Sequence, residues 1–367
     1  MALRIGVNAL YLIPGGVGGT EIYLARLLEA LAAIDTENRY IVFTNRETRV
    51  GLVPMRPNFE RAPQPVRAAN RPARILWEQT GLAIAAARHH LDVMFNPGFT
   101  APLLAPCANV TVFHDLQHKR HPEHFRWFDL PFWQALLYGA AHRSRKLIAV
   151  SETTRDDLMH YYGLPSERIA VVPHGVEGAF FEIGREWSLG RTEQYLLCVS
   201  TLHPHKNLDR LIQAFAEFRR EHPRFRLIIA GLRGFSSEAL EKQIDSLGLA
   251  DSVALPGWIP RQDLYDLYRR AHAFVYPSTF EGFGMPVLEA MAAGIPLVCS
   301  NIEPLRSTAG DAALLFDPND AAGMAEALRR IADDNALRER LAAAGPERAH
   351  KFTWERTARQ TLDALRS

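Results

Sequence analysis

The strongest constraint on the fold is an alternation of short, β-branched apolar runs with longer amphipathic ones. In the first half of the chain "LRIGVNAL" precedes the helical pattern "EIYLARLLEALAAI", and "RYIVFTN", "LDVMFNP", "NVTVFHD" and "KLIAVS" follow. Short runs of this kind predict buried strands, and the longer ones predict helices between them. The first half is therefore predicted to be a parallel sheet wrapped by helices.

A second series of the same kind begins after the segment Val172 to Gln194. This segment has neither the two-residue period of a strand nor the 3.6-residue period of a helix, and we interpret it as the connection between two domains. Its strand-like runs are "YLLCVST", "RLIIAGL", "SVALPGW", "AFVYPS" and "PLVCSN". The length of 367 residues also favours two domains over one large core. Ligands of doubly wound sheets bind outside the carboxyl ends of the strands, so two facing domains would place two such edges across one crevice.

Charge and cysteine usage exclude several classes of protein. With 42 basic and 41 acidic residues the net charge is +1, which gives no global field for nucleic acid or an anionic surface. Cys107, Cys198 and Cys299 lie far apart and indicate a reducing compartment. The first residues enter a strand-like run without a leader, and no apolar run approaches the ~18 residues of a bilayer span. We expect a cytoplasmic chain that binds no nucleic acid.

The least regular segment is Val53 to Gln79, which is rich in Pro and Arg. Its simplest interpretation is a solvated loop. The alternative is that the Arg-rich stretch 56–74 makes a peripheral contact with anionic lipid on the inner face of a membrane.

The stretch "STFEGFGMPVLEAMAAG", Ser278 to Gly294, carries the clearest chemistry. A strand is followed by a tight turn and a helix that starts near Gly284, with Pro286 in its first turn, so free backbone N–H groups would face a phosphate. Glu281 and Glu289 flank this anion site and could accept hydrogen bonds from hydroxyl groups on either side of it. The alternative is that both carboxylates only complement the positive end of the helix dipole.

A glycine-rich turn, "PGGVGGTE", Pro14 to Glu21, joins the first strand to the first helix. Its glycines allow a backbone to approach a ligand closely, although a plain loop is the alternative. The spacing lacks the third glycine of the dinucleotide fingerprint and the Gly-Lys-Ser/Thr ending of a P-loop, so a dehydrogenase and a nucleotide hydrolase are disfavoured.

Other polar residues follow predicted strands. Lys206 stands after "YLLCVST" and could neutralise a leaving diphosphate, with His203 and His205 beside it. The run "NVTVFHD" ends in His114 and Asp115, and His114 is either a site residue or a buried, hydrogen-bonded imidazole.

Three histidines, His118, His121 and His124, recur at every third residue and suggest a metal site. Pro122 interrupts the helix that would align them. We therefore expect no metal site there.

Taken together, these motifs resemble glycosyltransferase family 4, the retaining enzymes of the GT-B fold. The resemblance rests on "GGTEIY", "HDLQH", "AVSETTRDDL", "VVPHGV", "STLHPHKNLDRLIQAF" and "EGFGMPVLE", which occur in the family's order from residue 5 to about residue 320. It implies two Rossmann-like domains at residues 1–175 and 195–350, a linker at 176–194, and a last helix at 351–367 that returns to the first domain.

The resemblance also implies roles for individual residues. Glu281 would hold hydroxyls of the donor sugar, Glu289 would hold the ribose, Lys206 would stabilise the departing phosphate and His114 would line the transferred sugar. The remaining donor-binding positions are expected to be Gly18, Gly19, Thr201, His205, Phe283, Gly284, Met285 and Pro286. Many members carry an arginine where this chain has Thr201, and related versions carry one where it has His205, so the resemblance implies no second arginine beside Lys206.

The implied function is retaining transfer of a sugar, with mannose from GDP-mannose as the first expectation, to a glycan or lipid-linked acceptor in surface-polysaccharide assembly. The nucleoside-diphosphate sugar is a co-substrate, and neither a metal nor another cofactor is expected. The alternatives are a GT-B phosphorylase, a sugar-nucleotide epimerase, or a non-catalytic sugar-nucleotide-binding partner of another transferase.

Overall fold

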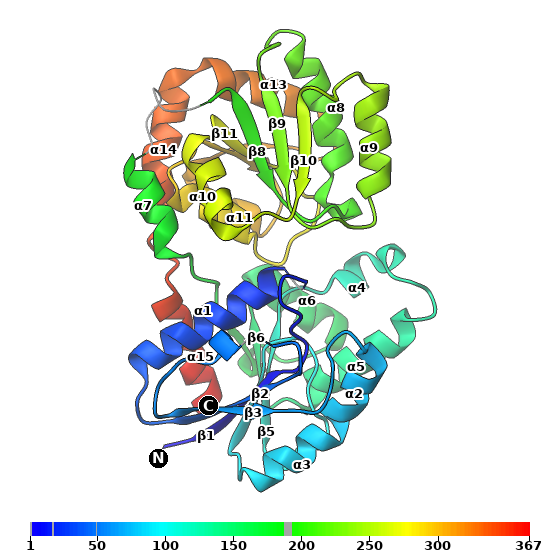
Figure 1. The fold of residues 1–367 in the computed structure, drawn as a ribbon, viewed down its shortest axis with the longest axis vertical. Helices are drawn as coiled ribbons and strands as arrows, with labels where there is room; N and C mark the ends of the chain where they lie inside the picture. The colour runs from blue at the N-terminus through cyan, green and yellow to red at the C-terminus, as the bar shows by residue number, and fades with distance from the viewer. Residues whose placement is uncertain (1, 17, 49, 187–192) are drawn as a thin grey trace. The chain divides into compact units, whose positions relative to one another are not determined.

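A computed structural model describes residues 2–16, 18–48, 50–186 and 193–367. The chain divides into two compact units (Figure 1). The N-terminal unit comprises Met1–Gly175 together with Trp354–Ser367, and the C-terminal unit comprises Val176–Thr353. Each unit is built around one parallel sheet, which confirms the predicted α/β class.

The sheet of the N-terminal unit has the strand order β3-β2-β1-β4-β5-β6-β7, and all neighbouring strands are parallel. Its inner strands are almost wholly buried, as their continuous apolar sequences require for a sheet covered on both faces. The strands are β1 (Arg4–Ala9), β2 (Arg39–Thr44), β3 (Phe59–Pro63), β4 (Val93–Asn96), β5 (Ala108–Phe113), β6 (Lys146–Ala149) and β7 (Ile169–Val171).

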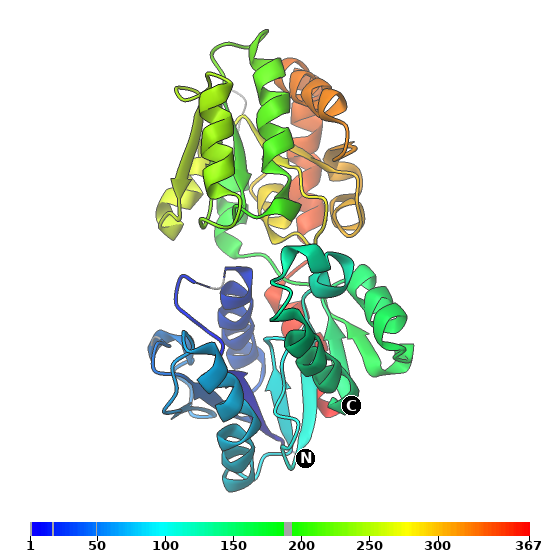
Figure 2. The same ribbon diagram turned by 90° about the vertical axis from the view of Figure 1, so that its right-hand side faces the viewer.

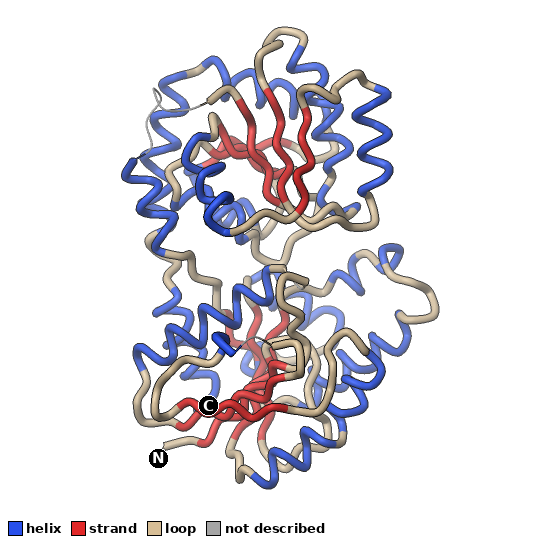
Figure 3. The backbone as a smooth tube through the Cα atoms, viewed as in Figure 1, coloured by secondary structure: helices blue, strands red, loops and turns tan. Residues whose placement is uncertain are grey.

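Helices cover both faces of this sheet (Figure 3). They are α1 (Gly19–Ile34), α2 (Arg71–Gln79), α3 (Gly81–Arg88), α4 (Gln117–Arg120), α5 (Leu130–Arg143), α6 (Glu152–Tyr162) and α15 (Trp354–Arg366), with short 3-10 turns η1 (Val50–Leu52), η2 (Pro122–His124) and η3 (Ser166–Arg168). The last helix, α15, packs against α1 and β6 (Figures 1 and 2). Two hydrogen bonds attach α15 further, from Thr357 Oγ1 to Pro173 O (2.8 Å) and from the Arg145 guanidinium to Leu365 O (2.9 Å).

The sheet of the C-terminal unit has the strand order β10-β9-β8-β11-β12-β13 and is also parallel. This is the order of a doubly wound sheet, in which the strand sequence reverses between β8 and β11. A ligand is therefore expected where those two strands end. The strands are β8 (Tyr195–Val199), β9 (Arg226–Ala230), β10 (Val253–Gly257), β11 (Ala273–Tyr276), β12 (Leu297–Ser300) and β13 (Ala313–Phe316).

The helices of the C-terminal unit again lie on both faces of its sheet (Figure 3). They are α7 (Gly178–Glu186), α8 (Leu208–Arg219), α9 (Ser237–Ser246), α10 (Arg261–Arg270), α11 (Met285–Ala292), α12 (Leu305–Ala309), α13 (Ala321–Asp333) and α14 (Asn335–Ala349), with 3-10 turns η5 (Pro204–Lys206) and η6 (Gly310–Ala312).

The segment 176–194 differs from the predicted linker. Val176 forms a bridge with Thr353, and α7 packs against α10 and α11, so the segment belongs to the C-terminal unit as far as it is described. A Cβ atom on Gly184 would lie 2.6 Å from the carbonyl oxygen of Ala292, so this close contact requires glycine. The part of the predicted linker at 187–192 lies outside the described residues. The return to the N-terminal unit begins at Trp354, three residues after the predicted start of the last helix.

The Pro- and Arg-rich segment from Val53 to Gln79 is also more ordered than the predicted loop. It contains the edge strand β3 and the helix α2. Of the strand "FERAP" only Phe59 and Ala62 are buried, which is too weak a pattern for prediction. Edge strands often carry charged side chains, so their sequences show a weaker apolar pattern than those of inner strands.

Among the described residues, the structure contains no helix that combines the length and the apolar character needed to cross a membrane.

Candidate functional site

Lys206 and Glu281 form an ion pair at the carboxyl end of the C-terminal sheet. Lys206 Nζ donates to Glu281 Oε1 at 2.6 Å and to the hydroxyl oxygen of Tyr276 at 3.1 Å. Lys206 ends η5, which follows β8, and Tyr276 ends β11, so the pair lies where the strand order reverses. The side chains of Lys206 and Glu281 are only 13% and 10% exposed. The fold thus brings together two of the predicted catalytic residues, at the predicted kind of position.

Backbone carbonyls hold the turn that carries Lys206. The backbone N–H and the hydroxyl of Thr279 both donate to His205 O, at 2.8 and 3.1 Å. Asn207, in the left-handed region with φ 56°, donates from Nδ2 to Pro277 O (3.0 Å) and Pro318 O (2.8 Å). The position of the lysine therefore does not depend on its ion pair alone. Of the other predicted donor residues, His205 and Thr201 lie in this same half-buried turn.

The helix α11 begins at Met285, four residues after Glu281. Gly284 precedes it with φ 97°, a conformation that favours glycine, and a Cβ atom there would lie 2.3 Å from Leu305 Cδ2. Pro286 occupies the first turn, and no side chain among the described residues caps the helix start. Uncapped N–H groups at a helix N-terminus attract an anion. Phe283 is buried and Met285 half-buried at the same start.

Glu289 occupies a different environment from Glu281, one helical turn into α11. It is 6% exposed, and its carboxylate accepts from the Arg261 guanidinium at 3.1 Å and from the Tyr268 hydroxyl at 3.1 Å. Burial raises the pKa of Glu289, and the charge of Arg261 opposes this rise. The two acids therefore have separate partners, a lysine for one and an arginine with a tyrosine for the other.

Arg261, which the sequence did not single out, joins Glu289 to a second buried acid. Its guanidinium also pairs with Glu177, whose other oxygen accepts from the Tyr265 hydroxyl at 3.0 Å. Burial lowers the pKa of Arg261, but Glu289 and Glu177 outweigh it and the pKa is raised. One signal in the sequence could have pointed to Arg261. It lies in the first turn of a helix, where its positive charge is unfavourable for the helix dipole, so a compensating contact elsewhere is expected.

In the N-terminal unit, the glycine turn lies between β1 and α1. Gly15 and Gly18 have φ of 72° and 62°, and Gly15 N donates to Glu21 Oε2 at 2.8 Å. A Cβ atom on Gly15 or Gly18 would meet nothing within 4 Å, so the backbone at these two positions borders open space. Gly19 is the first residue of α1.

His114 follows β5 and is buried, with Nε2 2.8 Å from Pro97 O. Its ring lies edge-on to Tyr23 and Phe99, at centroid distances of 4.9 and 5.2 Å, and stacks on His174 at 5.4 Å. Burial lowers the pKa of His114 to about 4. The imidazole is therefore neutral at neutral pH and donates a hydrogen bond to the carbonyl.

The three regularly spaced histidines do not meet at one point. His118 is buried and bonds through Nε2 to the Tyr162 hydroxyl at 2.7 Å. His121 and His124 stack at 5.2 Å with Glu123 beside them, and the ligand atoms of these three residues lie within 4.8 Å of one another. Among the described residues, this is the group whose geometry could hold a metal ion.

A buried acid, Glu78, also went unpredicted. It is 1% exposed and accepts from Asn8 Nδ2 (3.2 Å) and the Thr100 hydroxyl (3.0 Å) in the N-terminal unit. Burial raises its pKa. It lies in a segment that the sequence indicated to be a solvated loop, so no signal pointed to its burial.

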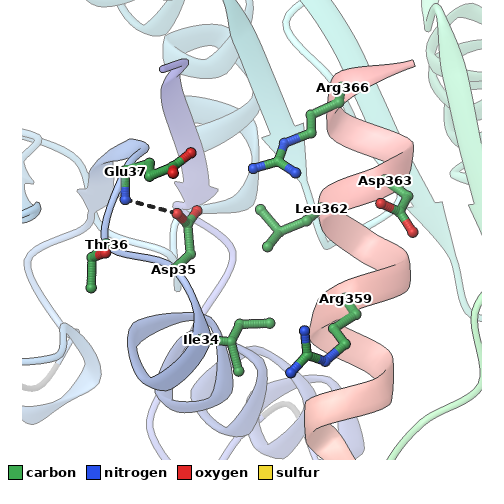
Figure 4. A pocket seen from close by; sticks show the side chains of 8 residues that line it. All are labelled: Ile34, Asp35, Thr36, Glu37, Arg359, Leu362, Asp363 and Arg366. Carbon is green, nitrogen blue, oxygen red and sulfur yellow. Dashed lines mark hydrogen bonds between the residues drawn. The ribbon is translucent and has the colours of Figure 1, made fainter. Parts of the chain in front are cut away.

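A pocket of about 510 Å³ lies between the end of α1 and α15 (Figure 4). Its lining includes Asp35, which accepts from Glu37 N at 3.0 Å, and the side chains of Arg359 and Arg366. Asp35 lies four residues before β2 begins, so the pocket borders the amino edge of the sheet. The pocket contains none of the predicted site residues, which follow the carboxyl ends of strands.

Two family models match the chain in succession. The model described as Glycosyltransferase Family 4 matches residues 17–179, and the model described as Glycosyl transferases group 1 matches residues 180–348. Together they span residues 17–348, which include most of both units and the Lys206, Glu281 and Glu289 positions.

Curated relatives agree with these matches. The O-antigen chain mannosyltransferase B of Escherichia coli is 30% identical over 290 residues, which cover 77% of this chain and 76% of that protein. A D-inositol 3-phosphate glycosyltransferase of Acidothermus cellulolyticus is 33% identical over 237 residues, covering 60% of this chain and 53% of that protein.

Solved structures share the fold. WaaG, a glycosyltransferase involved in lipopolysaccharide biosynthesis, superposes with a TM-score of 0.77 at 19% identity, over 98% of this chain and 99% of that one. Anabaena HepE, solved in complex with UDP and glucose, superposes with a TM-score of 0.76 at 19% identity over the whole of both chains. The chain therefore belongs to glycosyltransferase family 4 and has the GT-B fold.

Proposed function

We propose that this glycosyltransferase moves a hexose, with mannose as the first candidate, from a nucleoside-diphosphate sugar to a glycan or lipid-linked glycan, and that the sugar keeps its anomeric configuration. The observation that carries the proposal is the Lys206–Glu281 pair of 2.6 Å beside the uncapped start of α11. One cation, one carboxylate and a set of helix N–H groups meet there. They match a diphosphate that is flanked by a polyol.

Each group has a defined part in the proposed reaction. The bond between the anomeric carbon and the phosphate oxygen breaks, and its electron pair leaves with the diphosphate. The acceptor oxygen forms the new bond on the same face, and its proton passes to the leaving phosphate oxygen. Lys206 and the α11 N–H groups stabilise the growing negative charge, since preorganised donors act most strongly where charge develops. Glu281 orients the sugar through its hydroxyls.

The proposed division of labour extends to the other predicted residues. Glu289 binds the ribose, while Thr201, His205 and the backbone of Phe283, Gly284, Met285 and Pro286 complete the donor site. Gly18, Gly19 and His114 are proposed to contact the diphosphate and the transferred sugar. The open space beside Gly18 supports a role in ligand approach. The burial of His114 is compatible with a neutral hydrogen-bonding role, not with an acid or base at neutral pH.

The choice of donor rests on the relatives. The Escherichia coli relative is named a mannosyltransferase, which supports mannose. The Anabaena structure contains UDP, which supports a uridine nucleotide as the competitor to GDP.

We propose separately that the Arg-rich stretch 56–74 contacts lipid. Arg74 is buried and Arg61 donates to Thr44 Oγ1, so three of its guanidinium groups, those of Arg56, Arg67 and Arg71, remain exposed.

One experiment tests the proposed function. The purified chain is incubated with GDP-mannose or UDP-glucose, with and without a glycan acceptor, and release of nucleoside diphosphate is measured. Release that requires the acceptor, together with an α-linked product from an α-linked donor, is expected. Release of a sugar phosphate would indicate a phosphorylase, conversion of the donor without an acceptor would indicate an epimerase, and binding without turnover would indicate a non-catalytic partner.

A further inference from the structure

Exposed aromatic side chains gather in one short stretch of the N-terminal unit. Twelve large apolar side chains are exposed in the described part of the chain, and four of them lie within residues 127–138. Trp127 is 83% exposed, Phe128 57%, Phe132 57% and Tyr138 52%. Single exposed apolar residues are common on soluble proteins, but a cluster of large aromatic ones indicates a surface that meets something.

The helix α5, which carries two of these residues, is apolar on its outer side as well as its inner side. Leu137, Ala140 and Ala141 are buried in the core, as expected for a helix that covers a sheet. On the opposite side Phe132 and Tyr138 are exposed, where a helix on a soluble surface usually has charged residues. Packing in the core therefore explains the apolar residues on the inner side of α5 but not those on its outer side.

Neighbouring elements extend this surface. A Cβ atom on Gly139 would lie 2.9 Å from Leu103 Cδ1, so the loop that carries Leu104, which is 73% exposed, packs beside α5. On another side of α5, the guanidinium of Arg71, at the start of α2, lies 4.7 Å from the ring centroid of Trp133. We call Leu104, Trp127, Phe128, Phe132 and Tyr138 the aromatic surface.

The charges around the aromatic surface are mainly positive. From α4 to the end of α5, residues 117–143 contain four basic residues, Lys119, Arg120, Arg126 and Arg143, against Glu123 and Asp129. Arg120 is neutralised by Asp157. Arg126 and Arg143 are exposed and form no ion pair with any described residue. A partner of negative charge would complement them.

We propose that the aromatic surface, with Arg126 and Arg143, is a peripheral docking surface for an anionic lipid bilayer. Trp and Tyr side chains prefer the level of the lipid headgroups, and unpaired arginines beside them attract anionic lipid. At 14 residues α5 is shorter than a membrane span, so it lies along the interface while the rest of the unit stays in water. This surface borders the Arg-rich stretch 56–74 at Arg71 but differs from it in its aromatic side chains, since the aromatic residue of that stretch is Phe59, which is buried.

Cosedimentation with vesicles tests the proposal. The full chain is mixed with vesicles of phosphatidylcholine alone or of phosphatidylcholine with phosphatidylglycerol. Binding is expected only to the anionic vesicles and should weaken as salt is added, because surface charge is screened. Replacing Phe128 and Phe132 by serine should weaken partitioning roughly tenfold or more.

Charge variants and matched controls separate the surfaces. The double variant Arg126→Glu with Arg143→Glu should weaken binding by at least about fivefold, as expected for lost attraction between basic residues and anionic lipid. Replacing Met159 and Leu247 by serine removes two other exposed apolar side chains and should leave binding unchanged. Unfolding midpoints of all variants should match that of the wild type, because every changed side chain is exposed.

Three results would overturn the proposal. The first is that the Phe128 and Phe132 variant binds anionic vesicles as the wild type does. The second is that substitution of Arg56 and Arg67 abolishes binding while the aromatic surface variants retain it. The third is that the wild type ignores vesicles and sediments as a dimer that these variants dissociate. None of these results bears on the proposed transferase activity, which is assayed without lipid.

Discussion

Lys206 Nζ lies 2.6 Å from Glu281 Oε1, and the two residues are 75 positions apart in the sequence. In this structure the lysine is thus neutralised by the carboxylate that is proposed to hold the donor sugar. A bound diphosphate would compete for the same ammonium group, so donor binding is expected to redistribute the hydrogen bonds of Lys206 among Glu281, Tyr276 and the phosphate.

The two acids of the donor site should respond differently to substitution. Glu289→Gln is expected to weaken binding of the bare nucleoside diphosphate and of the full donor, whereas Glu281→Gln should weaken only the full donor. The reason is that each carboxylate helps only a ligand that carries its hydroxyls, and a charge-assisted hydrogen bond contributes roughly 1.5–3 kcal/mol. Calorimetric titration of each variant with both ligands measures this.

Glu177→Gln is the matched control for Glu289→Gln, since it removes the other carboxylate of Arg261 without a proposed ligand contact. It should leave both affinities near those of the wild type. If Glu281→Gln and Glu289→Gln changed the affinities for both ligands equally, the two acids would act through the helix dipole instead.

Arg261→Ala should destabilise the C-terminal unit. The substitution leaves Glu177 and Glu289, both less than a tenth exposed, without their shared counter-charge. Breaking a buried ion pair from one side typically costs about 3 kcal/mol. Urea unfolding should show this loss, and adding Glu289→Gln to Arg261→Ala should recover part of it. A variant as stable as the wild type would mean that water replaces the guanidinium without cost.

The sequence alone predicted where the candidate site lies in the C-terminal unit, for a physical reason. Lys206, Glu281 and Glu289 lie directly after strands or at a helix start, where parallel sheets bind ligands, so their position along the chain carries the information. Arg261 and Glu177 escaped prediction because their partners are remote in sequence. The polar pattern of α10 does not show that its half-buried Arg261 pairs with buried acids, and α7 is too short and too rich in glycine to show a clear period.

The fold itself was predictable to a similar degree. The inner strands are continuous apolar runs that predict strands, whereas β3, at the edge, buries only two of its five side chains and its sequence predicts a loop. The exposure of Trp127 and Phe128 could not be predicted, because an apolar residue is expected to be buried until the packing of its neighbours is known.

His114 should not titrate between pH 5 and 8. Because its pKa is lowered to about 4, the shape of the pH profile of kcat/KM in this range should be the same for the wild type and for His114→Gln, although the variant turns over more slowly. Loss of an acidic limb near pH 6.5 in the variant would show that His114 gains a proton there.

The same histidine affects stability with a definite sign. Between pH 6.5 and about 4 the unfolded imidazole binds a proton and the native one does not, so the free energy of unfolding falls as the pH is lowered through this window. His114→Gln should reduce that slope by one proton, about 1.4 kcal/mol per pH unit. His118→Gln is the control, because burial also lowers the pKa of His118 to about 4. It should change the slope equally and leave turnover unaffected.

Chelation should not abolish activity. The proposed chemistry stabilises the leaving diphosphate with Lys206 and the N–H groups of α11 and needs no metal ion, so turnover in EDTA should equal turnover without it. Complete loss that a divalent ion restores would contradict this. It would direct attention to His121, Glu123 and His124, and their replacement by alanine should then abolish the restoration.

The most direct test of the account is the effect of Lys206→Ala on turnover and on donor binding, measured in the same preparation. Negative charge on the diphosphate grows as its bond to the sugar breaks, so the lysine should stabilise the transition state more than the bound donor. Turnover is expected to fall by about two orders of magnitude, or ~3 kcal/mol, while the donor Kd changes only a few-fold. Lys242→Ala, which removes an exposed lysine of α9, should change neither quantity. Near wild-type turnover in Lys206→Ala, or a loss of donor binding as large as the loss of turnover, would contradict the proposed role of the Lys206–Glu281 pair.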